Sequence, residues 1–254
     1  MMKTSLIQNF KKNRARELYN IYNILQNKLR LSSADIYPIL KASQELEYEA
    51  SIKTDSSTWG YSISDLVLPI RTIKHMKPRG LEIRAKIDCS LKGDISKWGE
   101  LDEALLECEF SVTLYGELND KKYSICWHVD RDDGASSEEY HPLYHLHYSD
   151  GINHLGTKDE NKSFDWGNAI YLDCPRIVHC PLDLILGIGF YLTNFHFKGV
   201  FDKLINEHQF SIIYKHSQDA ILKPYFNNIA SHWDVDSGDL KWKNSKQLCP
   251  IIID

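Results

Sequence analysis

Two short segments of the chain, Ser124 to Asp130 and His141 to His147, concentrate histidine and aspartate. Each segment alternates polar and apolar residues, which is the pattern of a β-strand, where every second side chain points to the same face. Because the apolar faces of neighbouring strands pack on the same side, the parity of their pairing is fixed and the polar side chains share one surface. One register with this parity pairs His128 with Leu143 and Asp130 with His141. The predicted surface carries His128, Asp130, His141, His145 and His147, with Cys126 beside them.

This group of side chains suggests metal chemistry. Imidazole nitrogens and carboxylate oxygens are common protein ligands of zinc and similar divalent ions. The candidate ligands of a zinc or manganese ion are His128, Asp130, His141, His145 and His147. Three such ligands and a water would allow hydrolysis, with His128, Asp130, His145 and His147 as the catalytic residues. The alternative is that these histidines only hydrogen-bond to nearby carbonyl and carboxylate groups, and the sequence favours it because no further ligand such as glutamate occurs at a suitable spacing.

A second candidate site precedes a helix that is predicted to begin at Pro181. The first N–H groups of a helix have no partner within it and attract anions. Arg176 and His179 are therefore candidate anion-binding residues, and the helix dipole would lower the pKa of the neighbouring Cys180 thiol. The alternative is that Arg176 and His179 fasten the connection to the rest of the protein, while Asp183 offsets the helix dipole.

Two helices are predicted to open the chain. Apolar residues recur with the spacing of an amphipathic helix, which is expected to start near Thr4 or Ser5, at Leu18, Ile21, Tyr22, Leu25 and Leu29. Ser33 is the expected cap of a second helix that runs to about Glu45, with Pro38 in its opening turn. The basic run from Lys11 to Arg16 lies within the first helix and is interpreted as a solvated face.

The middle of the chain changes from helical to strand periodicity. Segments rich in β-branched and aromatic residues, separated by turn-forming residues, are expected to form strands at 46–52, 59–68, 81–91, 105–116, 121–130, 141–148 and 169–172. The turn signal between Tyr115 and Lys121 indicates a hairpin, and the strands are expected to form an antiparallel meander. The polar segment 149–168 is predicted to be a long loop, and 250–254 a terminal strand.

The remaining segments predict a C-terminal helical block on this sheet. Helices are expected from Pro181, over 202–209 and over 218–232, the last capped by Ser217. The predicted fold is thus α+β: an antiparallel meander with an N-terminal helix pair and a C-terminal helical block packed on it. It is expected to form one domain, 1–254, with N-terminal helices at 4–45, the sheet at 46–172 and C-terminal helices at 181–233.

Charge and cysteine usage restrict the class of protein. A net charge of -5 argues against a protein that mainly binds nucleic acid, because such binding depends on Lys and Arg neutralising phosphates. The six cysteines have no C-x-x-C spacing and no signal peptide is recognised, so a cytoplasmic protein with free thiols is expected. The apolar segment 181–197 is interrupted by polar residues, which indicates a buried helix and no membrane association.

Two functions remain open at this stage. The first is a non-catalytic accessory or interaction subunit of an intracellular complex, which binds a protein partner through the histidine- and aromatic-rich sheet face and the 149–168 loop. The second is a metal-dependent, zinc-type hydrolase that uses the His/Asp cluster on the same face.

Overall fold

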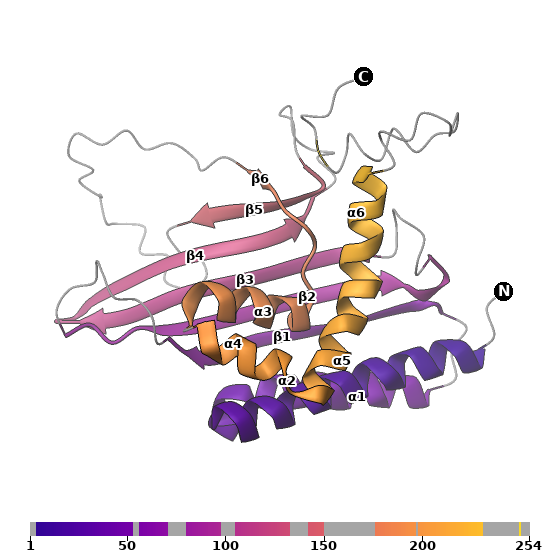
Figure 1. Ribbon diagram of the computed structural model, residues 1–254, viewed down its shortest axis with the longest axis horizontal. Coiled ribbons are helices and arrows are strands. Elements are labelled where there is room, and N and C mark those ends of the chain that lie inside the picture. Colours follow the sequence, from indigo (N-terminus) through magenta and orange to yellow (C-terminus); the bar gives the residue numbers. More distant parts are fainter. Residues whose placement is uncertain are drawn as a thin grey trace.

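The computed structural model describes residues 4–52, 56–70, 80–97, 105–132, 142–149, 176–196, 198–230 and 249. It confirms the predicted α+β architecture, with an antiparallel sheet, an N-terminal helix pair and C-terminal helices (Figure 1). The helices are α1 (Thr4–Leu29), α2 (Ser33–Ser51), η1 (Ile95–Lys97), α3 (Leu184–Phe195), α4 (Lys198–Ile205), α5 (His208–Ser217), η3 (Gln218–Leu222) and α6 (Lys223–Ala230). The strands are β1 (Thr58–Pro69), β2 (Arg84–Asp94), β3 (Leu105–Leu118), β4 (Lys121–Arg131), β5 (Tyr144–Ser149) and β6 (Ile177–Val178).

The N-terminal helix pair forms as expected, but α2 is longer than predicted. The predicted strand at 46–52 is wrong, because α2 continues to Ser51. Its buried stripe keeps helical spacing through Leu46 to Ala50, and this packing outweighs the local strand propensity. The cap is Ser32 and not Ser33, since the Ser32 side chain accepts a hydrogen bond from the Ala34 N–H.

The basic run in α1 is only partly the solvated face that its composition indicates. Lys12 and Arg16 are exposed, whereas Lys11 and Arg14 are 5% and 7% exposed. The Lys11 Nζ lies 3.4 Å from Glu49 Oε2 of α2. The Arg14 guanidinium lies over the ring of Trp59 on β1, 5.6 Å from its centroid. These two cations therefore help to join the helix pair to the first strand of the sheet.

The sheet is a meander in which each strand pairs with the next along the chain, in the order β1-β2-β3-β4-β5-β6. The predicted hairpin joins β3 and β4 through Asn119 and Asp120, both with positive φ, as a two-residue type I′ turn requires. The short strand β6 was not predicted, and the predicted strands 169–172 and 250–254 lie outside the described residues.

The C-terminal block differs from its prediction at the helix ends. The first helix begins at Leu184 and not at Pro181, with Asp183 as its cap. The segment 202–209 spans the end of α4 and the start of α5. Ser217 does not cap a helix, because its backbone is helical and η3, a π-helical turn, joins α5 to α6 without a break.

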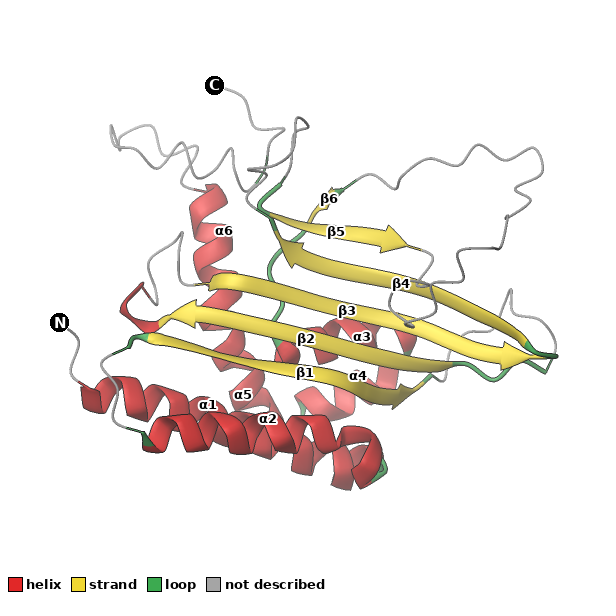
Figure 2. Cartoon of the chain, turned by 180° about the vertical axis from the view of Figure 1, so that it is seen from behind, coloured by secondary structure: helices red, strands yellow, loops and turns green. Residues whose placement is uncertain are grey.

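The two faces of the sheet have different neighbours. Helices α3 to α6 cover one face (Figure 1), whereas from behind β2, β3 and β4 are seen without a helix in front of them (Figure 2). Helices α1 and α2 run along the β1 edge, where α2 makes its main contact with the sheet. The core joins all these layers in one hydrophobic cluster. None of the helices in the described ranges combines the length and hydropathy needed to cross a membrane.

Candidate functional site on the open face of the sheet

The candidate histidines and Asp130 lie on the sheet face turned away from α3. Phe110 of β3 packs against Phe190 of α3, with ring centroids 6.2 Å apart, and Trp127 of β4 packs against Phe195. Side chains at alternate positions point the other way. We call that side the open face, formed by the outward side chains of β2 to β5: Lys86, Asp88, Ser90, Lys92, Glu107, Glu109, Ser111, Thr113, Cys126, His128, Asp130, His145 and His147.

The predicted parity of the β4–β5 pairing is confirmed, although the illustrated register is wrong by four residues. His128 lies opposite His147 and Asp130 opposite His145, in place of Leu143 and His141. Apolar packing determines which side chains share a face. It does not determine the register of the two strands, because any shift by an even number of residues keeps the parity. His128, Asp130, His145 and His147 are therefore brought together, while His141 lies outside the described residues.

Asp130 and His145 form the shortest contact of the cluster. The His145 Nε2 lies 2.9 Å from Asp130 Oδ1, and its Nδ1 lies 3.3 Å from the Pro142 carbonyl oxygen. A carbonyl only accepts hydrogen bonds and an ionised carboxylate does the same, so both nitrogens of His145 face acceptors. The His145–Asp130 contact is favourable when a proton lies between the two groups. His145 is 3% exposed, whereas the Asp130 side chain is 33% exposed, so only the imidazole of this pair is held away from solvent.

His128 and His147 form the second contact. The His147 Nδ1 lies 3.3 Å from His128 Nε2, with the rings edge to face at 79°. Asp130 Oδ2 lies 3.7 Å from the same His128 nitrogen. Each imidazole has one donor and one acceptor nitrogen when neutral, so the two rings hydrogen-bond directly when one of them donates. The cluster thus consists of successive contacts across β4 and β5, from His145 to Asp130, from Asp130 to His128 and from His128 to His147.

The same geometry bears on the metal hypothesis. Two nitrogens bound to one tetrahedral zinc at about 2.0–2.1 Å are about 3.3 Å apart, which is the spacing of the His128 and His147 nitrogens. Yet within the ranges that the structure describes, no three histidine, cysteine, aspartate or glutamate side chains are grouped so as to hold a metal ion. The described part of the cluster supplies two ligands with suitable spacing.

Strand β3 adds residues to the site that the sequence interpretation missed. Glu109 lies directly opposite Asp130, and Ser111 directly opposite His128. Glu109 is exposed, whereas the hydroxyl of Ser111 is buried and has no hydrogen-bond partner among the described residues. Next to them, the Thr113 hydroxyl contacts the Cys126 sulfur at 3.3 Å. The alternation of charged and apolar residues in β3 indicated that Glu109 and Ser111 share one face of the sheet. Only the register of β3 with β4 shows that this part of β3 lies beside Asp130 and His128.

The second candidate site differs from its prediction. Arg176, His179 and Cys180 precede the first residue of α3 by several positions, because the helix begins at Leu184. The His179 Nδ1 lies 2.7 Å from the Cys180 carbonyl oxygen. Burial raises the pKa of the Cys180 thiol, which is the opposite of the lowering expected beside a helix terminus. Anion binding by Arg176, His179 and Cys180 stays a prediction.

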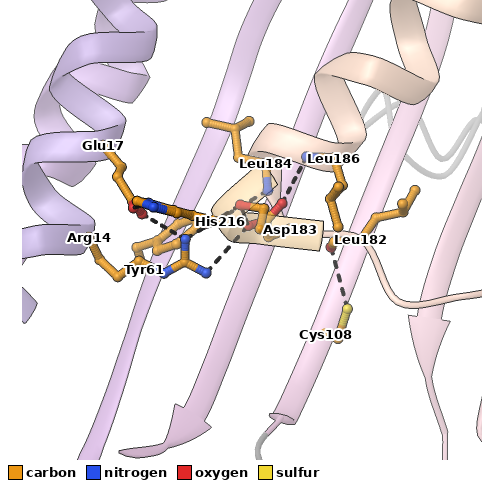
Figure 3. A network of polar contacts seen from close by, with 10 residues as sticks. Arg14, Glu17, Tyr61, Cys108, Leu182, Asp183, Leu184, Leu186 and His216 are labelled. Carbon is orange, nitrogen blue, oxygen red and sulfur yellow. Dashed lines mark hydrogen bonds and ion pairs between the residues drawn. The ribbon is translucent and has the colours of Figure 1, made fainter. Parts of the chain in front are cut away.

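The N-terminus of α3 is occupied by a carboxylate of the chain itself (Figure 3). The buried Asp183 accepts hydrogen bonds from the Leu186 N–H at 2.8 Å and from the Ser217 hydroxyl at 2.7 Å. Arg14 Nη2 lies 3.6 Å from the same carboxylate, and Arg14 Nη1 donates to Glu17 Oε2 at 2.7 Å. The Leu184 N–H donates to the Tyr61 hydroxyl. We call these residues the Arg14–Asp183 network; it fastens α1, β1, α3 and α5 together.

The buried groups of this network have displaced pKa values. Burial raises the pKa of Asp183, although Arg14 and the hydrogen bonds from Leu186 and Ser217 act against that rise. Burial by itself would lower the pKa of Arg14, but the carboxylates of Asp183 and Glu17 raise it above its usual value. The helix terminus is therefore neutralised internally, which leaves it unsuited to an external anion.

Comparison of the chain with protein-family models, with curated proteins and with solved structures finds no match.

Proposed function

We propose that this chain is a non-catalytic interaction subunit that binds a protein partner through the open face, with Glu109 at the centre of the contact. The observation that carries the proposal is the charge arrangement around Glu109. Like charges directly opposite each other on neighbouring strands are destabilising. Glu109 and Asp130 form such a pair, and His145 balances only Asp130.

The other charges of the open face are already balanced within the chain. Lys92 Nζ lies 2.8 Å from Glu107 Oε1, and Lys86 Nζ lies 3.3 Å from Asp88 Oδ2. Glu109 is exposed, and among the residues that the structure describes it makes no ion pair. A partner that placed a lysine or arginine at Glu109 would relieve its repulsion with Asp130. The flanking Ser90, His128 and His147 side chains are half-buried and suit the polar contacts of an interface rim.

Other parts of the expected surface belong to the same proposal. Most of the 149–168 loop lies outside the described residues, and its part in binding stays a prediction. A cytoplasmic site of action is also proposed, since the cysteines within the described ranges are free thiols.

Site-specific photo-crosslinking tests this proposal. A photoreactive phenylalanine analogue is placed at Ser90, directly opposite Glu109, of the full chain in the cells that produce it, and at the exposed Tyr37 of α2 as the matched control. One defined crosslinked protein from position 90 alone is expected, with a reduced yield in the Glu109→Lys variant. Equal products from both positions, or none, would refute the interface.

A second function, a metal-dependent hydrolase, is favoured by one observation. The His128 and His147 nitrogens have the spacing of two zinc ligands. The candidate set for this proposal is His128, Asp130, His141, His145 and His147, of which His141 lies outside the described residues, and zinc or manganese is the proposed ion. The ion would polarise a substrate or bind a water, and the His145–Asp130 pair would hold a proton beside it.

Elemental analysis of the purified chain separates the two functions. About one zinc or manganese per chain supports the hydrolase if the His128→Ala/His147→Ala variant loses the metal and keeps its circular dichroism spectrum. The control is His208→Ala, which alters an exposed histidine at the start of α5. Metal-free protein, or metal retained in the double variant, would reject the hydrolase and leave the interaction subunit.

A further inference from the structure

A cavity of about 830 Å³ opens on the helix-covered side of the molecule, away from the open face. It lies between the end of α1, the end of β1, and helices α3 and α4. Its volume falls in the range of about 300–1,000 Å³ that is typical of small-molecule sites. Cavities of this size in a small protein commonly bind a ligand.

Apolar side chains form much of the cavity wall. Leu25, Ile188, Leu192 and Leu204 line it and are at most 1% exposed, and the half-buried Leu29 and Val200 present apolar surface to the cavity. These residues come from α1, α3 and α4, so the wall is built by elements that the core already holds in place. A ligand group that filled this space would gain free energy roughly in proportion to its apolar area.

Two polar groups of the wall are hydrogen-bonded within the protein. The Tyr191 hydroxyl donates to the Pro69 carbonyl at 2.7 Å, and the His196 Nε2 lies 2.6 Å from the same oxygen. Since a carbonyl only accepts, this His196 nitrogen is the donor. These contacts join the end of β1 to α3. Beside them, the apolar part of the wall favours a ligand portion without hydrogen-bonding groups.

The mouth of the cavity is basic. Lys28, Arg30 and Lys203 line it, all three are exposed, and none of them is paired with a carboxylate within the described part of the chain. They come from separate places: the last turn of α1, the residue that follows it, and α4. Arg30 has a φ of 54°, so the chain turns sharply after α1 at this lining residue.

Of the described lining residues, Glu207 alone carries a carboxylate, and this carboxylate has a structural partner. Glu207 Oε2 accepts a hydrogen bond from the Phe210 N–H at 2.7 Å and caps α5. Its charge therefore offsets the positive end of a helix dipole. The three cations Lys28, Arg30 and Lys203 outnumber the Glu207 carboxylate, so the described residues give the mouth an excess of positive charge.

We propose that this cavity binds an amphipathic anion, with an apolar chain in the interior and a single carboxylate or phosphate group at Lys28, Arg30 and Lys203. The apolar wall accounts for the chain of the ligand, and the basic mouth accounts for its charged end. The same chemistry is offered by a free fatty acid and by an anionic lipid drawn from a membrane. This proposal is independent of the function proposed for the open face.

Calorimetric titration of the full chain with four ligands of equal chain length tests the proposal. The probes are decanoate, decyl phosphate, decanol and decyltrimethylammonium, each below the concentration at which it forms micelles. Decanoate and decyl phosphate are expected to bind one per chain, decanol at least tenfold more weakly, and the cationic probe not at all. Added salt should weaken binding of the two anions, because the mouth is exposed to solvent.

Variants of the mouth and of the interior separate the two contributions. Arg30→Glu/Lys203→Glu is expected to weaken decanoate binding at least tenfold, whereas Lys12→Glu, at an exposed lysine of α1 outside the cavity, should change it by less than twofold. Val200→Trp fills the space from the half-buried side of α4 and should abolish binding of decanoate. Circular dichroism and thermal unfolding of each variant verify that the fold is retained.

Several results would overturn the proposal. Equal binding of decanol and decanoate would remove the anion requirement, and equal losses in Lys12→Glu and the mouth variant would remove the site. No binding of either anion would reject the cavity as a ligand site. Flotation with phosphatidylglycerol and phosphatidylcholine vesicles then distinguishes the sources of the ligand: binding to phosphatidylglycerol vesicles that Val200→Trp abolishes indicates a membrane lipid, and decanoate binding without vesicle binding indicates a free acid.

Discussion

The contact between α3 and β3 determines which face of the sheet is left open, and one substitution tests it. Gly187 of α3 lies against the ring of Phe110, and a β-carbon at Gly187 would overlap three atoms of that ring. Phe110 is 1% exposed, so the ring has no free space into which it can move. In the sequence, Phe110 lies between Glu109 and Ser111 of the open face. The packing of α3 against Phe110 therefore helps to position that part of β3. The substitution Gly187→Ala should push α3 away from the sheet.

The expected loss of stability follows from two opposing contributions. Alanine in place of a helical glycine is favourable by about 1 kcal/mol, whereas adding an atom to a tightly packed core costs about 1–3 kcal/mol. The overlap involves three ring atoms, which places the cost at the upper end. Gly187→Ala should therefore lower the free energy of unfolding by about 2 kcal/mol. The control is Gly199→Ala in α4, where a β-carbon meets nothing within 4 Å and a gain of up to about 0.5 kcal/mol is expected.

Urea unfolding, followed by tryptophan fluorescence and circular dichroism, measures both free energies. The double variant Gly187→Ala/Phe110→Leu should lose less than the sum of the two single losses, because the smaller side chain makes room for the new methyl group. A Gly187→Ala protein that is as stable as the parent, or strictly additive losses, would refute the packing of α3 on β3 as described.

Three further predictions concern buried ionisable groups. Asp183→Ala should cost about 3–5 kcal/mol in urea unfolding, because it leaves Arg14 buried without its counter-charge and removes the cap of α3; Asp183→Asn should cost less, and equal losses would contradict this account. Because burial raises the Asp183 pKa, the folded state binds its proton more tightly than the unfolded state. The free energy of unfolding should therefore fall as pH rises from about 3.9 through the folded pKa, and a pH series of Asp183→Asn should lack this fall. Burial also raises the pKa of the Cys108 thiol to about 12. Above about pH 9 the thiol ionises in the unfolded state but not in the folded state, so the free energy of unfolding should fall by up to about 1.4 kcal/mol per pH unit. In a pH series, the free energy of unfolding of Cys108→Val should fall less steeply over this range.

The fold was largely predictable because its elements follow simple periodicities. The stripe from Leu18 to Leu29 identified α1, and alternating residues identified the long strands β1 to β4. Errors occur where local propensity and packing disagree. Residues 46–51 carry strand-type and polar residues, yet Leu46 and Ala50 extend the buried stripe of α2, and burial of that stripe outweighs propensity. The two-residue strand β6 is too short to produce a periodic signal.

The candidate site was predictable in its composition but not in its geometry. The parity of β4 and β5 could be inferred, since apolar residues such as Val129 and Leu146 must face the core together. The register could not, because pairings that differ by even shifts satisfy the same rule. For this reason the contacts of His128 with His147 and of Asp130 with His145 required the structure. That Glu109 lies opposite Asp130 could be recognised only from a second register, that of β3 with β4.

The Arg14–Asp183 network shows why a local pattern cannot decide whether a charge is solvated. Arg14 stands among other basic residues in α1, which is the usual signature of an exposed face. Its partners come from distant segments: Ser217, 203 residues away, contacts Arg14 and also donates to Asp183. A buried cation is tolerated only when counter-charges and hydrogen bonds offset its desolvation. These groups lie at the start of α3 and in α5, so Arg14 is buried with its partners only when the whole fold has assembled. Asp183 therefore stabilises α1, through Arg14, as well as α3, which it caps.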